Sequence, residues 1–140
     1  MKTPPEFLYH GTTTNYLESI KKHGLLPSRP SKWQRRFRMR SAVFFADSVK
    51  RAKTYAVIRR YLSGFPTVGE RYELFESLWR RSYRQRQVVI LRVKTSVLSS
   101  CPIPDYVWKI FGELGQWVYF ARVPPEQIEV LINAEWGPIA

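Results

Sequence analysis

The chain is poor in cysteine and histidine, and these scarcities exclude several classes of protein. Its single cysteine, Cys101, cannot form an intramolecular disulfide, so we expect a reducing, cytoplasmic setting rather than a disulfide-stapled secreted scaffold. With only His10 and His23, a zinc site would need carboxylates as well, and no ligand spacing in the sequence supports one. We therefore expect a protein that binds no metal.

Long apolar runs are also missing. None approaches the roughly 20 residues that a transmembrane helix needs, and the opening Met-Lys-Thr-Pro-Pro-Glu precedes no apolar signal-peptide core, so we expect no membrane segment. The 140 residues are 44% hydrophobic and 15% aromatic, which predicts one packed domain over residues 1–140.

Acidic residues are scarce relative to basic ones: 11 Asp and Glu stand against 23 Lys and Arg, a formal net charge of +12. The excess is concentrated. Residues 28–60 hold eleven bases and one acid, a balance of +10, whereas residues 101–140 hold two bases and five acids, a balance of −3. Such asymmetry favours a polyanionic partner such as DNA or RNA, and a merely solubilising surface is the alternative.

The N-terminal segment predicts a strand followed by a helix. The strand covers residues 7–10. The helix is expected to begin at Asn15 as its N-cap, with Glu18 reaching back to the cap, and to end at His23 with Gly24 as the stop.

A second strand and helix follow a basic loop. Residues 28–41 have no clean period and carry six bases, which indicates a loop. An apolar strand over residues 42–46 then leads into a helix over residues 48–62, capped by Asp47 or Ser48.

The remaining chain mixes strands and helices without regular alternation. We expect an amphipathic helix over 70–84, a strand over 87–95, a short helix over 105–112, and strands over 116–121 and 128–132, the last one ending the fold. This pattern predicts the α+β class with a mostly antiparallel or mixed sheet flanked by helices.

Two segments together resemble a known family. Leu-Tyr-His-Gly-Thr at residues 8–12, and Val-Phe-Phe-Ala-Asp at residues 43–47 followed by Tyr55, are similar to the diphtheria-toxin-like, poly(ADP-ribose)-polymerase-like ADP-ribosyltransferases. The likeness returns at residues 115–132, and residues 57–114 are not diagnostic. It implies a split sheet and a reaction that consumes NAD.

The resemblance also implies roles for single residues. His10 would hydrogen-bond the adenosine ribose of NAD, and the backbone of Gly11 would hold the nicotinamide carboxamide, which leaves no room for a side chain. Tyr55 would stack on the nicotinamide, with Phe44 as a second face. Thr12 completes the expected cofactor-binding set. Each residue has a plainer alternative, such as a structural histidine at a strand end or a tyrosine packed in the core.

The third signature residue of the family is a glutamate, and this chain departs from it. Counting back seven residues from Val123 places Gln116 there. Glutamine keeps a hydrogen bond but supplies no negative charge, and such a loss costs about 3 kcal/mol, or roughly 10²–10³ in rate. Glu113 is the alternative occupant of this position, and Glu126 after the proline corner is a weaker one.

The basic loop corresponds to the segment that covers the cofactor in the family. We expect its bases and an interleaved aromatic residue to contact the acceptor or nucleic acid: Trp33, Arg35, Arg36, Arg38 and Arg40.

These features favour a mono-ADP-ribosyltransferase that uses NAD to modify DNA or RNA, a toxin-like activity that would require an antitoxin or other inhibitor protein. Three alternatives stay open. They are the same reaction on a protein side chain, an RNA 2′-phosphotransferase, which shares the ancestral fold and also consumes NAD, and a catalytically weak module that binds ADP-ribose or nucleic acid. The phosphotransferases need further Arg and His residues to hold a phosphate, and only His23 is available as a second histidine.

Overall fold

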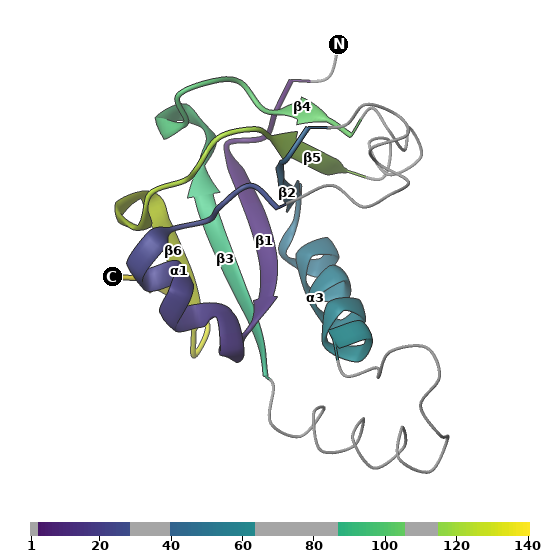
Figure 1. Ribbon diagram of the computed structural model, residues 1–140, viewed down its shortest axis with the longest axis vertical. Helices are drawn as coiled ribbons and strands as arrows, with labels where there is room; N and C mark the ends of the chain where they lie inside the picture. Colours follow the sequence, from purple (N-terminus) through teal and green to yellow (C-terminus); the bar gives the residue numbers. More distant parts are fainter. Residues whose placement is uncertain (1–2, 29–39, 64–86, 106–114) are drawn as a thin grey trace.

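A computed structural model describes residues 3–28, 40–63, 87–105 and 115–140. Within these ranges the chain forms one seven-stranded sheet in which every pair of neighbouring strands is antiparallel, in the order β4-β5-β2-β1-β3-β6-β7 (Figure 1). The strands are β1 (Phe7–Thr13), β2 (Val43–Ala46), β3 (Val88–Lys94), β4 (Ile103–Pro104), β5 (Gln116–Tyr119), β6 (Ile128–Ile132) and β7 (Glu135–Pro138). The predicted α+β class is confirmed.

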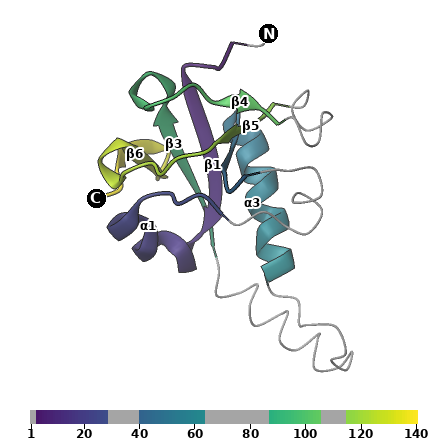
Figure 2. The same ribbon diagram turned by 45° about the horizontal axis from the view of Figure 1, so that its top comes forward.

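Two helices pack on opposite faces of this sheet. Helix α1 (Leu17–His23) contributes Ile20 to a buried cluster that contains Leu8 and Leu91, whereas α3 (Val49–Ser63) contributes Ala52 to a different cluster with Ala46 and Ile90. Because side chains alternate between the two faces of a strand, these contacts place α1 and α3 on opposite sides. Figure 2 shows α3 running beside β1, away from α1.

The main core lies on the α1 side of the sheet. Its fully buried members come from five strands and include Leu8, Phe45, Leu91, Tyr119 and Ile128. Phe45 of β2 and Trp117 and Tyr119 of β5 belong to the same core. The α3 side holds smaller clusters, one of them built around Ala46, Ala52 and Ile90.

Strand β1 is paired very differently on its two sides. Along β3 the pairing runs its whole length, from Phe7 opposite Lys94 to Thr13 opposite Val88. Along β2 the only register pair among the described residues is Tyr9 with Ala46. Beyond that pair β1 and β2 separate, and the sheet opens between them.

Several predicted elements are confirmed, and two details of the first predicted helix are wrong. The helix predicted over 48–62 is α3, with the Ser48 hydroxyl accepting from the Arg51 amide at 3.2 Å. Asn15 caps no helix: a 3-10 turn precedes α1, and the Asn15 side chain accepts a hydrogen bond from Thr13 instead. Glu18 pairs with Lys21 at 3.2 Å rather than reaching back.

The strand over 128–132 does not end the fold. It turns at Asn133 and Ala134, both at positive φ, and continues as β7. The predicted helix over 70–84 lies outside the described residues, as does the helix over 105–112 apart from Asp105.

Candidate active site

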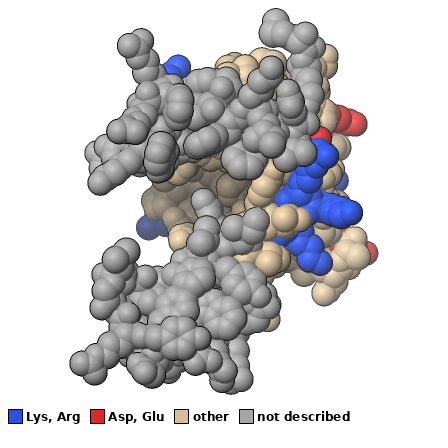
Figure 3. Space-filling model, turned by 90° about the vertical axis from the view of Figure 1, so that its right-hand side faces the viewer, with Lys and Arg blue, Asp and Glu red and all other residues tan. Residues whose placement is uncertain are grey.

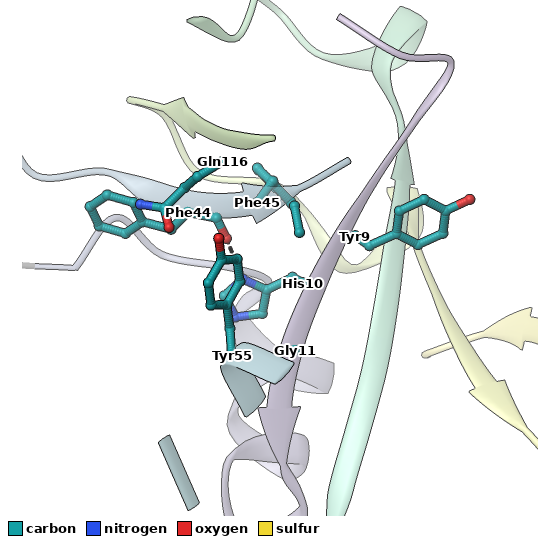
Figure 4. A pocket seen from close by; sticks show the side chains of 8 residues that line it. Tyr9, His10, Gly11, Phe44, Phe45, Tyr55 and Gln116 are labelled. Carbon is teal, nitrogen blue, oxygen red and sulfur yellow. Dashed lines mark hydrogen bonds between the residues drawn. The ribbon is translucent and has the colours of Figure 1, made fainter. Parts of the chain in front are cut away.

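A cavity of about 260 Å³ lies where β1 and β2 separate. It is lined from β1, β2, α3 and β5 by Tyr9, His10, Gly11, Phe44, Phe45, Ala46, Tyr55 and Gln116. Figure 4 shows His10, Tyr55, Phe44 and Gln116 gathered around one space, whereas the Tyr9 side chain points away from it. Tyr9 contacts Trp136, with 5.9 Å between ring centroids.

His10 bridges the gap between the two strands. Its Nδ1 lies 2.8 Å from the Phe44 carbonyl oxygen. A carbonyl only accepts, so Nδ1 carries the proton, and in a neutral ring Nε2 is then an acceptor. The ring also meets Phe45 edge-on, with centroids 6.0 Å apart and planes at 72°. These contacts orient the imidazole at the point where backbone pairing has stopped.

Gly11 is required by the helix behind it. A Cβ at this position would overlap the Ala52 carbonyl oxygen and lie 2.7 Å from the Cβ of Ala56. The expectation that Gly11 lacks a side chain to let a ligand approach is therefore incomplete, because the close packing of α3 on β1 already demands glycine. The same packing brings Tyr55, one turn beyond Ala52, to the cavity.

The Tyr55 side chain is half-buried. Burial is the largest influence on its hydroxyl and raises its pKa above the ordinary 10.0, Arg51 lowers it, and Asp47 and Asp105 raise it. The phenol consequently stays protonated at neutral pH and offers a flat apolar ring with a hydroxyl at one end. This combination suits stacking against a planar ligand.

Gln116 enters the cavity at the start of β5, where its register partner is Ala46. Its Nε2 donates to Oδ2 of Asp105 at 2.7 Å, and Asp105 is only 2% exposed. The sequence had indicated Gln116 but not Asp105. The sequence feature that could have indicated Asp105 is its position directly after Pro104, as a single acidic residue at a corner between strands.

Gly115 leads the chain into β5. It has φ +89°, and a Cβ there would overlap the Asp47 carboxylate and the Arg51 guanidinium, which pair at 2.8 Å. The Asp47 amide also donates to the Gly115 carbonyl at 2.9 Å. Contacts of Gly115 with Asp47 and Arg51, at the start of α3, therefore fix the position of the turn that precedes Gln116.

A second cavity of about 170 Å³ adjoins the first on the α1 side. The two share His10 and Phe44, and the second is also lined by Thr12, Ile20 and Leu25. Thr12, predicted with the cofactor-binding set, is 1% exposed and lines only this second cavity. Together the cavities have the size of small-molecule sites, about 300–1,000 Å³.

The structure describes the two ends of the basic loop, at residues 28 and 40–41. Its ends are tied together, because Ser28 and Ala42 exchange backbone hydrogen bonds of 2.9 and 3.2 Å. Arg40 lies with its guanidinium 5.0 Å from the centre of the Phe120 ring and does not line either cavity. The other predicted contacts lie outside the described residues: Trp33, Arg35, Arg36, Arg38 and the alternative Glu113.

Positive charge also gathers on α3, whose residues Lys50, Arg51 and Lys53 are exposed. Figure 3 shows a group of basic side chains beside a hollow in this side of the molecule. Within the described ranges, no three His, Cys, Asp or Glu residues come together to hold a metal ion. None of the described helices has the length and apolarity to cross a membrane.

Fold and cavity together define an α+β protein with a ligand-sized cleft between two diverging strands. No protein-family model matches the chain. A segment of 25 residues is 64% identical to proteins named probable RNA 2′-phosphotransferase from Escherichia coli and Shigella boydii. The match covers 18% of this chain and 14% of each relative, so the likeness is confined to one short segment.

Proposed function

We propose that this protein is an NAD-dependent transferase that moves ADP-ribose onto RNA. One observation carries the proposal: two elements distant in sequence, β1 and α3, bring the imidazole of His10, the backbone of Gly11 and the ring of Tyr55 to one cavity. These are the residues that the resemblance to ADP-ribosyltransferases singles out. The separation of β1 from β2 supports a sheet of that family's split type.

The residues present fit NAD. The aromatic rings of Tyr55 and Phe44 line the first cavity and suit a planar nicotinamide ring, while the Gly11 backbone suits its carboxamide. His10 and Phe44 connect this cavity to the second one, where the buried Thr12 lies. A dinucleotide with two planar ends needs such a pair of joined cavities.

NAD, when bound, supplies an ADP-ribosyl group on a good leaving group. The work of this chain is then mainly positioning. His10 is held by Phe44 and orients a ribose hydroxyl, and Tyr55 with Phe44 excludes water from the reacting face. Gln116 contributes a hydrogen bond to a second hydroxyl.

Two observations favour RNA as the acceptor. The relatives that share the 25-residue segment are named as enzymes acting on RNA. The chain also carries a net charge of +12, with exposed bases on α3 next to the cavity. Phosphate contacts of this kind make binding depend steeply on salt, with a slope of about −0.7 per contact for single strands.

RNA 2′-phosphotransferase activity is the second candidate, and the short match favours it directly. Against it stands the small number of candidate phosphate ligands at the cavity, since the lining residues that the structure describes include one histidine and no arginine. Modification of a protein, a toxic role with an inhibitor partner, and a cytoplasmic location stay predictions.

The test offers NAD labelled in its adenylate half to RNA, DNA, protein and 2′-phosphorylated RNA in separate reactions. We expect nicotinamide release with label on RNA, weakened as salt rises. Release of a cyclic ADP-ribose phosphate from 2′-phosphorylated RNA would instead establish the second candidate. Label on protein alone would overturn the RNA acceptor, and absence of nicotinamide release with every acceptor would overturn the enzyme.

A further inference from the structure

Asp105 and Gln116 are joined by two hydrogen bonds at the edge of the cavity. The Asp105 amide donates to the Gln116 carbonyl at 3.0 Å, and the Gln116 Nε2 donates to Asp105 Oδ2 at 2.7 Å. The pairing of β4 with β5, where Pro104 lies opposite Trp117, holds the two residues in register. Asp105 lines neither cavity and is 2% exposed, so it lies behind Gln116.

This contact decides which way the Gln116 amide faces. An ionised carboxylate has acceptors only, so the NH₂ group of the amide must turn toward Asp105. The carboxamide oxygen then points away from Asp105, and Gln116 lines the cavity. A ligand hydroxyl in the cavity therefore meets an acceptor.

The same contact carries charge to the cavity. Hydrogen bonds to a carboxylate are stronger than neutral ones, and they polarise the group that donates them. In a buried setting this effect is screened less than in water. Tyr55 lines the same cavity, and its pKa is raised first by burial and to a smaller extent by Asp47 and Asp105.

We propose that Asp105 is a positioning residue that holds the Gln116 amide with its oxygen toward the cavity and makes that oxygen a better acceptor. The pair would thereby supply part of what a glutamate supplies in the related transferases. This inference rests on the proposed NAD-dependent function, and it explains how a glutamine can occupy the third position of an active enzyme.

The proposal predicts that the carboxylate of Asp105 and the amide of Gln116 can exchange positions without loss of activity. Gln116→Glu alone places two carboxylates in contact, which disfavours both being charged. Asp105→Asn alone removes the charge and lets the amide turn either way. The double variant Asp105→Asn/Gln116→Glu restores one donor and one carboxylate, with the charge now at the cavity. Glu135→Gln, which neutralises an exposed acid outside both cavities, is the matched control.

The kinetic test measures kcat and KM for NAD by nicotinamide release with the acceptor that the wild type modifies. We expect each single variant to lower kcat about tenfold or more, with KM changed less than about twofold. The double variant should regain at least the wild-type kcat, and Glu135→Gln should equal the wild type. A double variant no better than either single variant, or a Gln116→Glu variant faster than the wild type, would overturn the role of Asp105.

A second readout needs neither ligand nor activity. In the ligand-free protein, the NMR signals of the Gln116 side-chain NH₂ should be protected from exchange with water and should shift in Asp105→Asn. Unprotected signals that stay in place would overturn the inference. A wild type that releases no nicotinamide would overturn the proposed function separately, while the NH₂ signals still decide the contact. Should Asp105→Asn fail to fold, Gln116→Glu and the double variant still decide the matter.

Discussion

The two sides of β1 differ in a way that accounts for the site. Toward β3 the strand is paired from Phe7 to Thr13, whereas toward β2 its single register pair among the described residues is at Tyr9. On the β3 side, side chains pack against one another: Arg92 lies 4.3 Å from the Phe7 ring centre and 4.4 Å from that of Trp136, and it pairs with Glu129 at 3.0 Å. On the β2 side, side chains surround a cavity.

Because backbone pairing between β1 and β2 stops early, other contacts must hold these two strands in place around the cavity. A pair of strands that stops after one register pair leaves backbone and side-chain groups that need partners. Here the His10 ring bonds the Phe44 carbonyl across the gap, and α3 covers the opening through its close contact with Gly11.

The largest effect is expected for Gly11→Ala. The added methyl meets the backbone of α3 rather than the end of a flexible side chain, so helix and strand must move apart. We expect a loss of about 3 kcal/mol in the free energy of unfolding, measured by denaturant titration. Gly137→Ala on β7 is the control, because its methyl meets nothing within 4 Å and should change stability by less than about 0.5 kcal/mol. Equal effects of the two variants would show that α3 does not sit tightly on β1.

The second effect concerns the two histidines. His10→Ala removes the bridge to Phe44 and the ring at the junction of the cavities, so nicotinamide release should fall more than tenfold (about 1.4 kcal/mol of barrier). His23→Ala at the exposed end of α1 should leave the rate unchanged. A His10→Ala variant that retains the wild-type rate would contradict the assignment of the cavity.

A smaller effect concerns the pH dependence of stability. The pKa of Tyr55 is raised above 10.0 in the folded protein, so as pH rises the unfolded chain loses this proton first. The contribution to stability is complete below pH 10 and declines as pH rises further. Wild type should therefore lose stability more steeply than Tyr55→Phe above pH 10, as followed by thermal unfolding. Parallel curves for the two proteins would show that the phenol is not buried.

The smallest effect is expected on the fully paired side. Glu129→Gln weakens a partly exposed ion pair, with side chains 21% and 40% exposed, and such pairs contribute no more than about 1 kcal/mol. Arg92 keeps its two aromatic neighbours, so unfolding should change little and nicotinamide release should not change. A loss of activity here would mean that the two sides of β1 are coupled.

Much of the fold and the position of the cavity could be predicted from local patterns. A few neighbouring residues are enough to predict the short strand that ends in His10 and Gly11. The same holds for the apolar strand that precedes the capped helix carrying Tyr55. That His10, Gly11 and Tyr55 lie at one cavity was predicted from the family resemblance. The roles of these residues stay predictions.

The misses have physical reasons. Asp105 contacts Gln116 only because β4 pairs with β5 around a corner, which no local pattern reveals. β7 follows a turn with Ala134 at φ +63°, a conformation that alanine rarely adopts, so the usual asparagine–glycine signal was missing. Asn15 failed as a cap because a 3-10 turn comes before the helix.

The most direct test of the central claim is a crystal structure of the protein with a non-hydrolysable NAD analogue. We predict the nicotinamide end between β1 and β2, against Tyr55 and the Gly11 backbone, with the ligand passing His10 into the second cavity. An analogue bound elsewhere on the molecule, or a cavity that stays empty of it at saturating concentration, would contradict the account.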